Sequence, residues 1–266
     1  MHKIKRVNRE KMSVEESRKV IGDNLSFAAS EAYKLLRANL DFSLPDSAGC
    51  KVIGITSALR GEGKSTTSIN IAYTEALTGK KVLLLEADLR LPTIAKRLAV
   101  RSVPGISNLL AGQCKGGDIL QPSGLIKNLW VVTAGDVPPN PSELLDSKQM
   151  GDVLKALSES FDVIFVDLPP ITAVSDALVI SKLVSGMVVV VRQDYCDRAS
   201  LAEVVRQLRF AEAKVLGFVM TGSDVMLKSY KSNYRYKRYG YYTSKKYYSK
   251  SAYERASDKQ RQSNEE

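Results

Sequence analysis

The sequence lacks any apolar run long enough to cross a membrane. Its longest apolar runs, VLLL at 82–85 and MVVVV at 187–191, have the length of strands, whereas a membrane-spanning helix needs about 20 apolar residues. The basic N-terminal segment HKIKRVNREKM is not followed by the apolar core of a secretory signal. We therefore expect a cytoplasmic protein that has no span of its own and reaches a membrane only through a partner.

Cysteine is also scarce, and Cys50, Cys114 and Cys196 lie far apart along the chain. Because their number is odd and their spacing is not that of metal ligands, the pattern predicts reduced thiols. Aliphatic residues nearly vanish after Leu227, where Tyr, Lys, Arg and Ser take over. Such a segment buries too little apolar surface to offset its ordering entropy, so we expect a flexible tail.

The formal net charge of +10 belongs to the ends of the chain. Residues 1–11 carry five Lys/Arg and one Glu, residues 226–266 carry eleven Lys/Arg and four acids, and the residues between them have a net charge of −1. The basicity therefore says little about the globular body. We expect a basic N-terminal segment (1–25), one globular domain (26–225) and a basic tail (226–266).

Apolar stretches of strand length alternate with helical patterns through the middle of the chain. Predicted helices cover 26–44, 64–78, 142–160 and 198–212, with a helical hairpin-like region after 88, and predicted strands cover 51–58, 81–88, 129–135, 161–170, 186–192 and 213–220. Strands that are apolar on both faces and alternate with helices indicate an α/β fold, with a mainly parallel sheet flanked by helices on both faces.

The strongest functional pattern is ALRGEGKST at 58–66, between a predicted strand and a predicted helix. Backbone N–H groups of such a P-loop wrap nucleotide phosphates, while Lys64 reaches the β- and γ-oxygens and the Ser65 hydroxyl ligates Mg²⁺. Ala58 stands where the first glycine is usual. The predicted nucleotide-binding residues are Gly61, Glu62, Gly63, Lys64, Ser65 and Thr66, and the predicted cofactors are ATP and Mg²⁺.

Three acidic residues lie toward the carboxyl ends of predicted strands. Asp167 ends an apolar strand about a hundred residues after the P-loop, where a Walker B carboxylate holds the metal. Glu86 and Asp88 alternate along LLLEADLRLP, so we expect both side chains, and Arg90, on one face near the nucleotide. One acid could position Mg²⁺ and the other could accept a proton, although acids at a solvated strand end would show the same spacing.

These three motifs together resemble those of the bacterial tyrosine kinases, in the Gram-positive form that regulates capsule or exopolysaccharide synthesis. GEGKST, LLLEADLRLP and VIFVDLPP match the Walker A, A′ and B motifs of that family, and VPPNPSELL and DLPPITAVSDA look like further family segments. The resemblance covers about Ser26 to the C-terminus. It implies the fold of the related MinD/ParA-type ATPases, used here as a P-loop kinase domain.

The resemblance also implies roles for single residues. Lys64 and Ser65 would bind the phosphates and Mg²⁺, Asp167 would hold the metal, and Asp88 would bind Mg²⁺ and orient or deprotonate the tyrosine. Glu86 stands where the family more often has Asp, and it completes the catalytic set. The family's oligomerisation motif, Glu-x-x-Arg-x-x-Arg, corresponds to Glu31, Lys34 and Arg37, with Lys in place of the first Arg. The same spacing also fits an ordinary charged helix face.

The tyrosine content of the tail indicates which activity we expect. It contains nine of the twelve tyrosines, and these predicted phosphoacceptors are Tyr230, Tyr234, Tyr236, Tyr239, Tyr241, Tyr242, Tyr247, Tyr248 and Tyr253. Each phosphate adds about −1.5 to −2 charges, so four or five would cancel the tail's positive charge. We predict a tyrosine kinase that phosphorylates its own tail, in trans within an oligomer.

Two other functions fit parts of the sequence. One is a MinD/ParA-type ATPase switch without kinase activity, whose tail would bind nucleic acid or an anionic membrane. Leu59 stands where those ATPases have their signature lysine, which argues against this alternative. The other is a non-catalytic scaffold, which the intact Lys64, Ser65, Asp88 and Asp167 disfavour.

Partners are implied by the resemblance alone. It implies a membrane adaptor of the polysaccharide chain-length type that activates the kinase at the inner face of the membrane. It also implies a tyrosine phosphatase that resets the tail, and a ring-shaped, octamer-like homo-oligomer. Nucleic acid is not expected as a partner.

Overall fold

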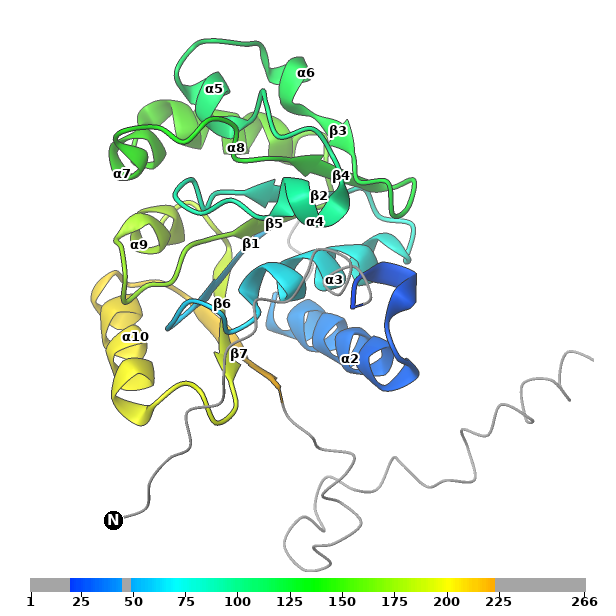
Figure 1. Ribbon diagram of the computed structural model, residues 1–266, viewed down its shortest axis with the longest axis vertical. Helices are drawn as coiled ribbons and strands as arrows, with labels where there is room; N and C mark the ends of the chain where they lie inside the picture. The colour runs from blue at the N-terminus through cyan, green and yellow to red at the C-terminus, as the bar shows by residue number, and fades with distance from the viewer. Residues whose placement is uncertain (1–19, 45–48, 223–266) are drawn as a thin grey trace, which may run out of the picture. The chain divides into compact units, whose positions relative to one another are not determined.

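A seven-stranded sheet forms the centre of the computed structural model, which describes residues 20–44 and 49–222 (Figure 1). Its strands are β1 (Lys51–Ser57), β2 (Val82–Glu86), β3 (Gln121–Pro122), β4 (Leu129–Val132), β5 (Val163–Asp167), β6 (Gly186–Arg192) and β7 (Val215–Thr221). They lie in the order β3-β4-β2-β5-β1-β6-β7, and all neighbours are parallel except β3 and β4. The predicted mainly parallel sheet is confirmed.

Helices cover both faces of this sheet (Figure 1). They are the 3-10 helix η1 (Gly22–Asn24) and the α-helices α2 (Phe27–Ser43), α3 (Lys64–Ala76), α4 (Ile94–Leu98), α5 (Ile106–Leu110), α6 (Gly116–Ile119), α7 (Pro141–Leu145), α8 (Lys148–Ser158), α9 (Asp176–Ser181) and α10 (Arg198–Phe210). Leu40, Ile69 and Ile94 bury α2, α3 and α4 against one face. The helices α8, α9 and α10 cover the other face.

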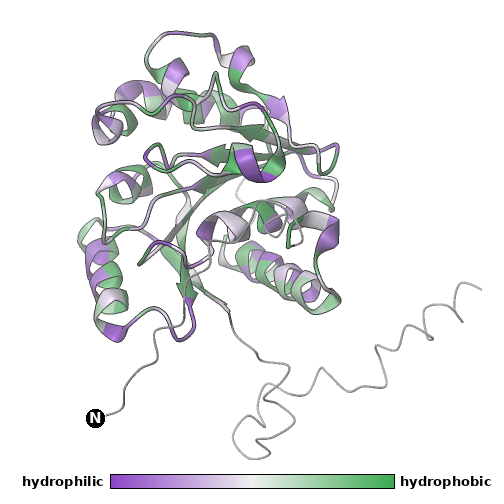
Figure 2. Cartoon of the chain, viewed as in Figure 1, coloured by the Kyte–Doolittle hydropathy of each residue, from purple (hydrophilic) through white to green (hydrophobic). Residues whose placement is uncertain are grey.

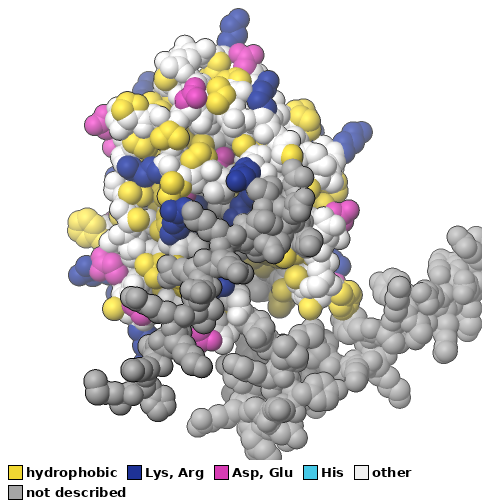
Figure 3. Space-filling view, viewed as in Figure 1, with side chains coloured by type: hydrophobic (Ala, Val, Ile, Leu, Met, Phe, Trp, Pro, Cys, Tyr) yellow, Lys and Arg dark blue, Asp and Glu magenta, His cyan; other side chains and the backbone are white. Residues whose placement is uncertain are grey.

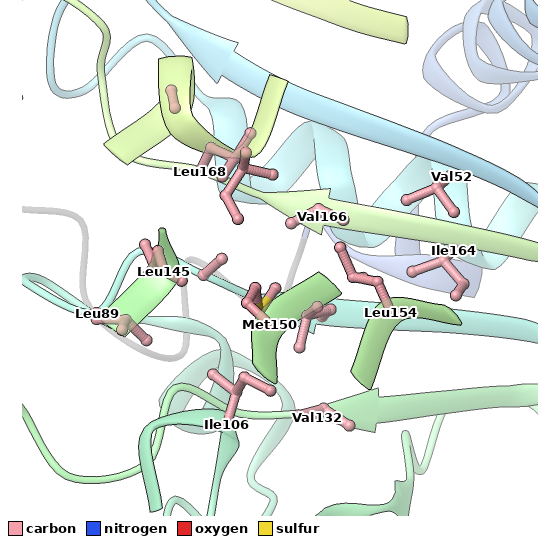
Figure 4. Close-up of a cluster of buried hydrophobic side chains, with 14 of the residues drawn as sticks. Val52, Leu89, Ile106, Val132, Leu145, Met150, Leu154, Ile164, Val166 and Leu168 are labelled. Carbon is pink, nitrogen blue, oxygen red and sulfur yellow. The ribbon is translucent and has the colours of Figure 1, made fainter. Parts of the chain in front are cut away.

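The core consists of two apolar clusters separated by the sheet. The strands between them are hydrophobic along their length (Figure 2), and every residue of β2 and β5 is buried. Figure 4 shows part of one cluster, where Met150 and Leu154 of α8 lie against Val132, Ile164 and Val166 of the strands. Burial on both faces explains why these strands are continuous apolar runs in the sequence.

Short polar side chains define where several helices begin. Ser26 accepts a hydrogen bond from the Ala29 amide before α2, and Asp197 accepts one from Ser200 before α10. Ser147 caps α8 in the same way, through the Met150 amide. Each cap satisfies one of the amide groups that lack a partner in the first turn of a helix.

The predicted helix over 142–160 is two helices: α7 ends at Leu145 with Asp146 as its C-cap, and Ser147 caps the start of α8. The region after 88 holds three short helices, α4, α5 and α6, and the edge strand β3, which the sequence did not predict. Pro122 in β3 cannot donate to a sheet ladder, which is tolerated at an edge. Short elements of this kind bury too few periodic residues to give a clear pattern.

The strand order brings the three motif strands together. The strand β5 lies between β1 and β2, with Asp167 aligned with Ile55 on one side and with Glu86 on the other. Because parallel strands end at the same edge of a sheet, the P-loop and the acidic residues meet there.

None of the helices in the described part of the chain is long and apolar enough to span a membrane. On the face drawn in Figure 3, basic, acidic and hydrophobic side chains are interspersed wherever the described surface is visible. This mixture agrees with the near-neutral charge of the sequence between its basic ends.

Candidate nucleotide-binding and active site

The P-loop joins the end of β1 to the start of α3 and needs glycine at two positions. Gly61 and Gly63 have φ angles of +88° and +94°, in the left-handed region that side chains rarely adopt. Gly63 directly precedes α3, a helix of 13 residues whose free N-terminal amides face the loop. A helix N-terminus of this kind binds anions such as phosphates.

Glu62 holds the loop in shape. Its side chain is fully buried and accepts hydrogen bonds from the amides of Leu59, at 2.6 Å, and Arg192, at 3.2 Å. The Thr221 hydroxyl of β7 donates to the Glu62 carbonyl at 2.6 Å. The predicted nucleotide contact of residue 62 is therefore limited to its backbone, since its carboxylate ties the loop to β6.

Lys64, Asp88 and Asp167 form a buried cluster beside the loop. The Lys64 Nζ lies 2.7 Å from an Asp88 carboxylate oxygen and 3.7 Å from Oδ2 of Asp167. Burial alone would lower the pKa of Lys64, but attraction to Asp167 and Asp88 outweighs it and raises that pKa. The lysine is therefore held charged between the two acids, where it would also meet a phosphate.

The donor set fits a magnesium ion. Oδ1 of Asp167 accepts a hydrogen bond from Ser68, whereas its Oδ2 is buried without a hydrogen-bond donor. The Ser65 hydroxyl lies 3.4 Å from Lys64 Nζ, on the same side of the loop. Within the described residues no three acidic, histidine or cysteine side chains are grouped as metal ligands. Mg²⁺ in phosphate sites needs only one or two protein ligands, because phosphates and waters supply the others.

Glu86 has different partners from Asp88. Its fully buried carboxylate accepts hydrogen bonds from the backbone amides of Thr93, Ile94 and Ala134. Burial raises its pKa to about 7, against the lowering effect of the amides. The predicted shared face of the two acids ends with the strand, because β2 stops at Glu86 and strand alternation does not continue to residue 88.

Arg90 is attracted by Asp88, but its hydrogen bonds go to residues outside the nucleotide motifs. Its guanidinium makes two hydrogen bonds to Asp176, at 2.9 and 3.1 Å, and one to the Ser142 hydroxyl, at 2.8 Å. Asp176 is completely buried at the start of α9. Sequence reasoning did not single out Asp176 or Ser142 as functional, although both lie in segments that resemble the family.

A second arginine, Arg97, contacts the P-loop although it belongs to none of the sequence motifs described above. Arg97, on the short helix α4, donates from Nη1 to Oγ1 of Thr66 at 3.0 Å. Thr66 is the last residue of the P-loop motif and lies in the first turn of α3. A prediction of α4 as a separate helix would have been needed to find this contact.

The remaining predicted site residues lie elsewhere. Glu31 and Lys34 pair with each other at 2.7 Å on the surface of α2, and the Arg37 Nε is buried without a hydrogen-bond partner. The interface role of these three residues stays a prediction. The nine predicted phosphoacceptor tyrosines, from Tyr230 to Tyr253, lie outside the described residues.

Fold and site together define a P-loop nucleotide-binding protein, with the phosphate loop and two acids at the carboxyl edge of a parallel sheet. In agreement, the AAA domain family model matches residues 50–214. The MinD septum site-determining protein of Pyrococcus horikoshii, solved with Mg-ADP, shares the fold, with a TM-score of 0.55 at 24% identity over 64% of this chain and 70% of that one.

Closer similarities identify the family. The chain is 36% identical to the tyrosine-protein kinase YwqD of Bacillus subtilis (strain 168) over 216 residues, which cover 81% of this chain and 87% of that protein. It also matches the solved kinase domain of the Escherichia coli tyrosine kinase ETK, with a TM-score of 0.71 and 29% identity over 82% of this chain and 84% of that one. The chain belongs to the bacterial tyrosine-protein kinase family.

Proposed function

We propose that this chain is a protein-tyrosine kinase that transfers the γ-phosphoryl group of Mg-ATP to tyrosines of its own segment 226–266. The observation that carries the proposal is the buried cluster of Lys64, Asp88 and Asp167 beside the P-loop. Family membership supports tyrosine as the acceptor, and the tyrosine-rich segment supplies nine candidate acceptors in the same chain.

Lys64 has a different partner before and after nucleotide binding in this proposal. Without nucleotide it neutralises Asp88 at 2.7 Å. When phosphates enter the loop, the ammonium moves to their β- and γ-oxygens, and Asp88 is released toward the acceptor. The Asp167 oxygen that lacks a donor, together with the Ser65 hydroxyl, would hold Mg²⁺ directly or through water. A metal ion held by these two residues would supply positive charge that neutralises the phosphates.

The transfer itself needs one proton acceptor. The tyrosine oxygen forms a bond to the γ-phosphorus, the bond to the β-phosphate oxygen breaks, and ADP leaves. The phenol has a pKa near ~10 and loses its proton during this step. Asp88 accepts that proton or hydrogen-bonds the phenol to align it. A strong base is not needed if the transition state is loose.

The wider setting is also part of the proposal. We expect transfer between chains of a ring-shaped homo-oligomer that contacts through the α2 face of Glu31, Lys34 and Arg37. A membrane adaptor of the polysaccharide chain-length type would recruit and activate the kinase at the inner face of the membrane. A tyrosine phosphatase would reset it, and the cycle would control capsule or exopolysaccharide synthesis and export.

An anti-phosphotyrosine blot with phosphopeptide mass spectrometry tests the activity. The purified chain is incubated with Mg-ATP, with and without the cytoplasmic segment of an adaptor, beside Lys64→Met and a chain truncated after residue 224. Lys182→Met is the matched control, because Lys182 is exposed on the far side of the sheet from α3. We expect signal that requires Lys64 and the tail but not Lys182.

A mixture of two variants, neither of which can phosphorylate its own tail, tests transfer between chains. Full-length Lys64→Met supplies the tail tyrosines without catalysis, and the truncated wild-type chain supplies catalysis without the nine tail tyrosines. Phosphorylation of the Lys64→Met chain in the mixture requires transfer in trans. If ATP is hydrolysed but no phosphotyrosine forms even with the adaptor segment, the chain is an ATPase switch of the MinD/ParA type instead.

A further inference from the structure

Arg97 lies beside the phosphate loop because its helix, α4, is fixed by packing. The helix α4 buries Ile94 completely in the same apolar cluster as Ile69 of α3. Residues three apart lie on the same side of a helix, so Arg97 also faces α3. Its Nη1 reaches Oγ1 of Thr66 at 3.0 Å. Packing therefore aims this guanidinium at the first turn of α3.

Glu86 anchors the start of the same helix. Its carboxylate accepts the amides of Thr93 and Ile94, which are the first amides of α4 and would otherwise lack partners. The third acceptor contact, to the Ala134 amide, ties the carboxylate to the segment after β4. The hydrogen bonds of Glu86 therefore fix the start of α4, the helix on which Arg97 lies.

The guanidinium has unused capacity for an anion. In the described part of the chain this guanidinium forms no ion pair, and its one side-chain hydrogen bond goes to Thr66. Asp167 and Glu86 attract it from a distance, but burial outweighs them and lowers its pKa. Both acids already have other partners, in Ser68 and Lys64 for Asp167 and in three amides for Glu86. A guanidinium carries five N–H donors.

We propose that Arg97 is a nucleotide-binding residue that contacts the phosphates shared by ADP and ATP. Thr66 follows Ser65 in the loop, where backbone amides hold the α- and β-phosphates, whereas Lys64 and Asp88 lie at the γ-phosphate end. A planar guanidinium binds phosphate through two parallel hydrogen bonds. This inference rests on the nucleotide site proposed above and adds a residue to it that no Walker motif contains.

Equilibrium binding of Mg-ADP and Mg-ATP, measured by calorimetry, tests the assignment without any kinase readout. Arg97→Gln removes the charge and keeps a donor for Thr66, whereas Arg97→Lys keeps the charge and removes the planar fork. Lys96→Gln is the matched control, because it removes one charge from an exposed position of the same helix. Thermal unfolding without nucleotide reports whether each variant is folded.

We expect Arg97→Gln to weaken both nucleotides by about ten- to a hundredfold, by equal factors, as for loss of a charge-assisted bidentate contact. Arg97→Lys should recover part of that loss, and Lys96→Gln should change affinity less than twofold. If Arg97→Gln binds both nucleotides as wild type does, Arg97 only joins α4 to α3 and the inference is wrong. A loss confined to ATP overturns the assignment to the shared phosphates. Absence of binding by the wild-type chain would instead refute the proposed nucleotide site.

Discussion

Asp167 shows at the scale of one residue how function opposes stability. Its carboxylate is fully buried, and Oδ2 has no hydrogen-bond donor although Lys64 lies 3.7 Å away. A buried acceptor without a donor costs free energy of folding. We interpret that cost as the condition for holding a metal ion when nucleotide is bound.

The first prediction concerns Asp167→Asn. The amide keeps the oxygen that accepts from Ser68 and removes the buried charge, while Lys64 keeps its shorter ion pair with Asp88 at 2.7 Å, so the melting temperature without nucleotide should be unchanged or higher. Autophosphorylation should fall at least about a hundredfold, because a metal ligand with this role contributes several kcal/mol to the transition state. Differential scanning fluorimetry and a Mg²⁺ titration of activity measure the two effects. A variant that loses stability along with activity would contradict the trade-off.

The second prediction concerns Glu86. Glu86→Ala removes the acceptor of three backbone amides, of which those of Ile94 and Ala134 are buried and that of Thr93 is partly buried, and each unpartnered buried group costs about 1–3 kcal/mol. We expect a loss of roughly 3–5 kcal/mol in the free energy of unfolding, measured by urea denaturation. Glu86→Gln should lose less, since its oxygen can still accept from α4. Equal losses for Ala and Gln would show that the amides find other acceptors.

The third prediction concerns the cysteines. Burial raises the pKa of the Cys50 and Cys196 thiols to about 11 in each case. The charged form is disfavoured, so at pH 8 the thiolate fraction should be roughly a hundredfold below that of a thiol with an ordinary pKa of 9.0. Alkylation by iodoacetamide, followed by mass spectrometry, should be slow for both residues and should accelerate up to pH ~11. Rapid reaction at pH 7 would contradict this.

At the scale of elements, Arg90 joins three segments that are distant in sequence. It follows β2 and contacts Ser142 of α7 and Asp176 of α9. The Ser142 hydroxyl also donates to Asp176, at 2.5 Å. The loops that surround the phosphate site are therefore tied together by a charged pair in which Asp176 is completely buried and Arg90 is partly exposed.

The fourth prediction follows from this unequal burial. Arg90→Ala leaves the Asp176 charge buried with Ser142 as its remaining partner, and breaking one side of a buried pair costs about 3–5 kcal/mol. Partial exposure of Arg90 puts the expected loss at the lower end of that range. Asp176→Asn introduced into Arg90→Ala should recover part of the loss, because it removes the unpaired charge. Urea denaturation of both single variants and the double variant measures this coupling, and strict additivity would refute it.

The extent of sequence-based prediction differs between elements for physical reasons. The strands and long helices were predicted because burial on two faces, or on one helical stripe, leaves a period in the sequence. Glu86 and Asp88 were expected on one face, but alternation applies only while the chain is a strand, and β2 ends at Glu86. Arg97 was missed because α4 has five residues and its contact with Thr66 depends on tertiary packing.

At the scale of the whole molecule, charge is divided between a balanced body and a basic C-terminal segment. Residues 226–266 carry eleven Lys/Arg against four acids, together with nine tyrosines. Each phosphotyrosine contributes about −1.5 to −2 charges at neutral pH. Four phosphates therefore roughly cancel the positive charge of this segment and five reverse it, which offers a way to regulate association between copies of the chain.

The last prediction is that autophosphorylation dissociates the oligomer through this reversal. An unmodified basic segment can be attracted to the acidic site of a neighbouring chain, whereas a phosphorylated one is repelled. Analytical ultracentrifugation of the dephosphorylated chain should show larger species than the phosphorylated chain, and the difference should shrink as salt screens the charges. The chain truncated after residue 224 is the control and should not respond to Mg-ATP. If the phosphorylated and dephosphorylated chains sediment alike at low salt, then the phosphates act on another partner, and the oligomer is held by contacts such as those predicted for Glu31, Lys34 and Arg37.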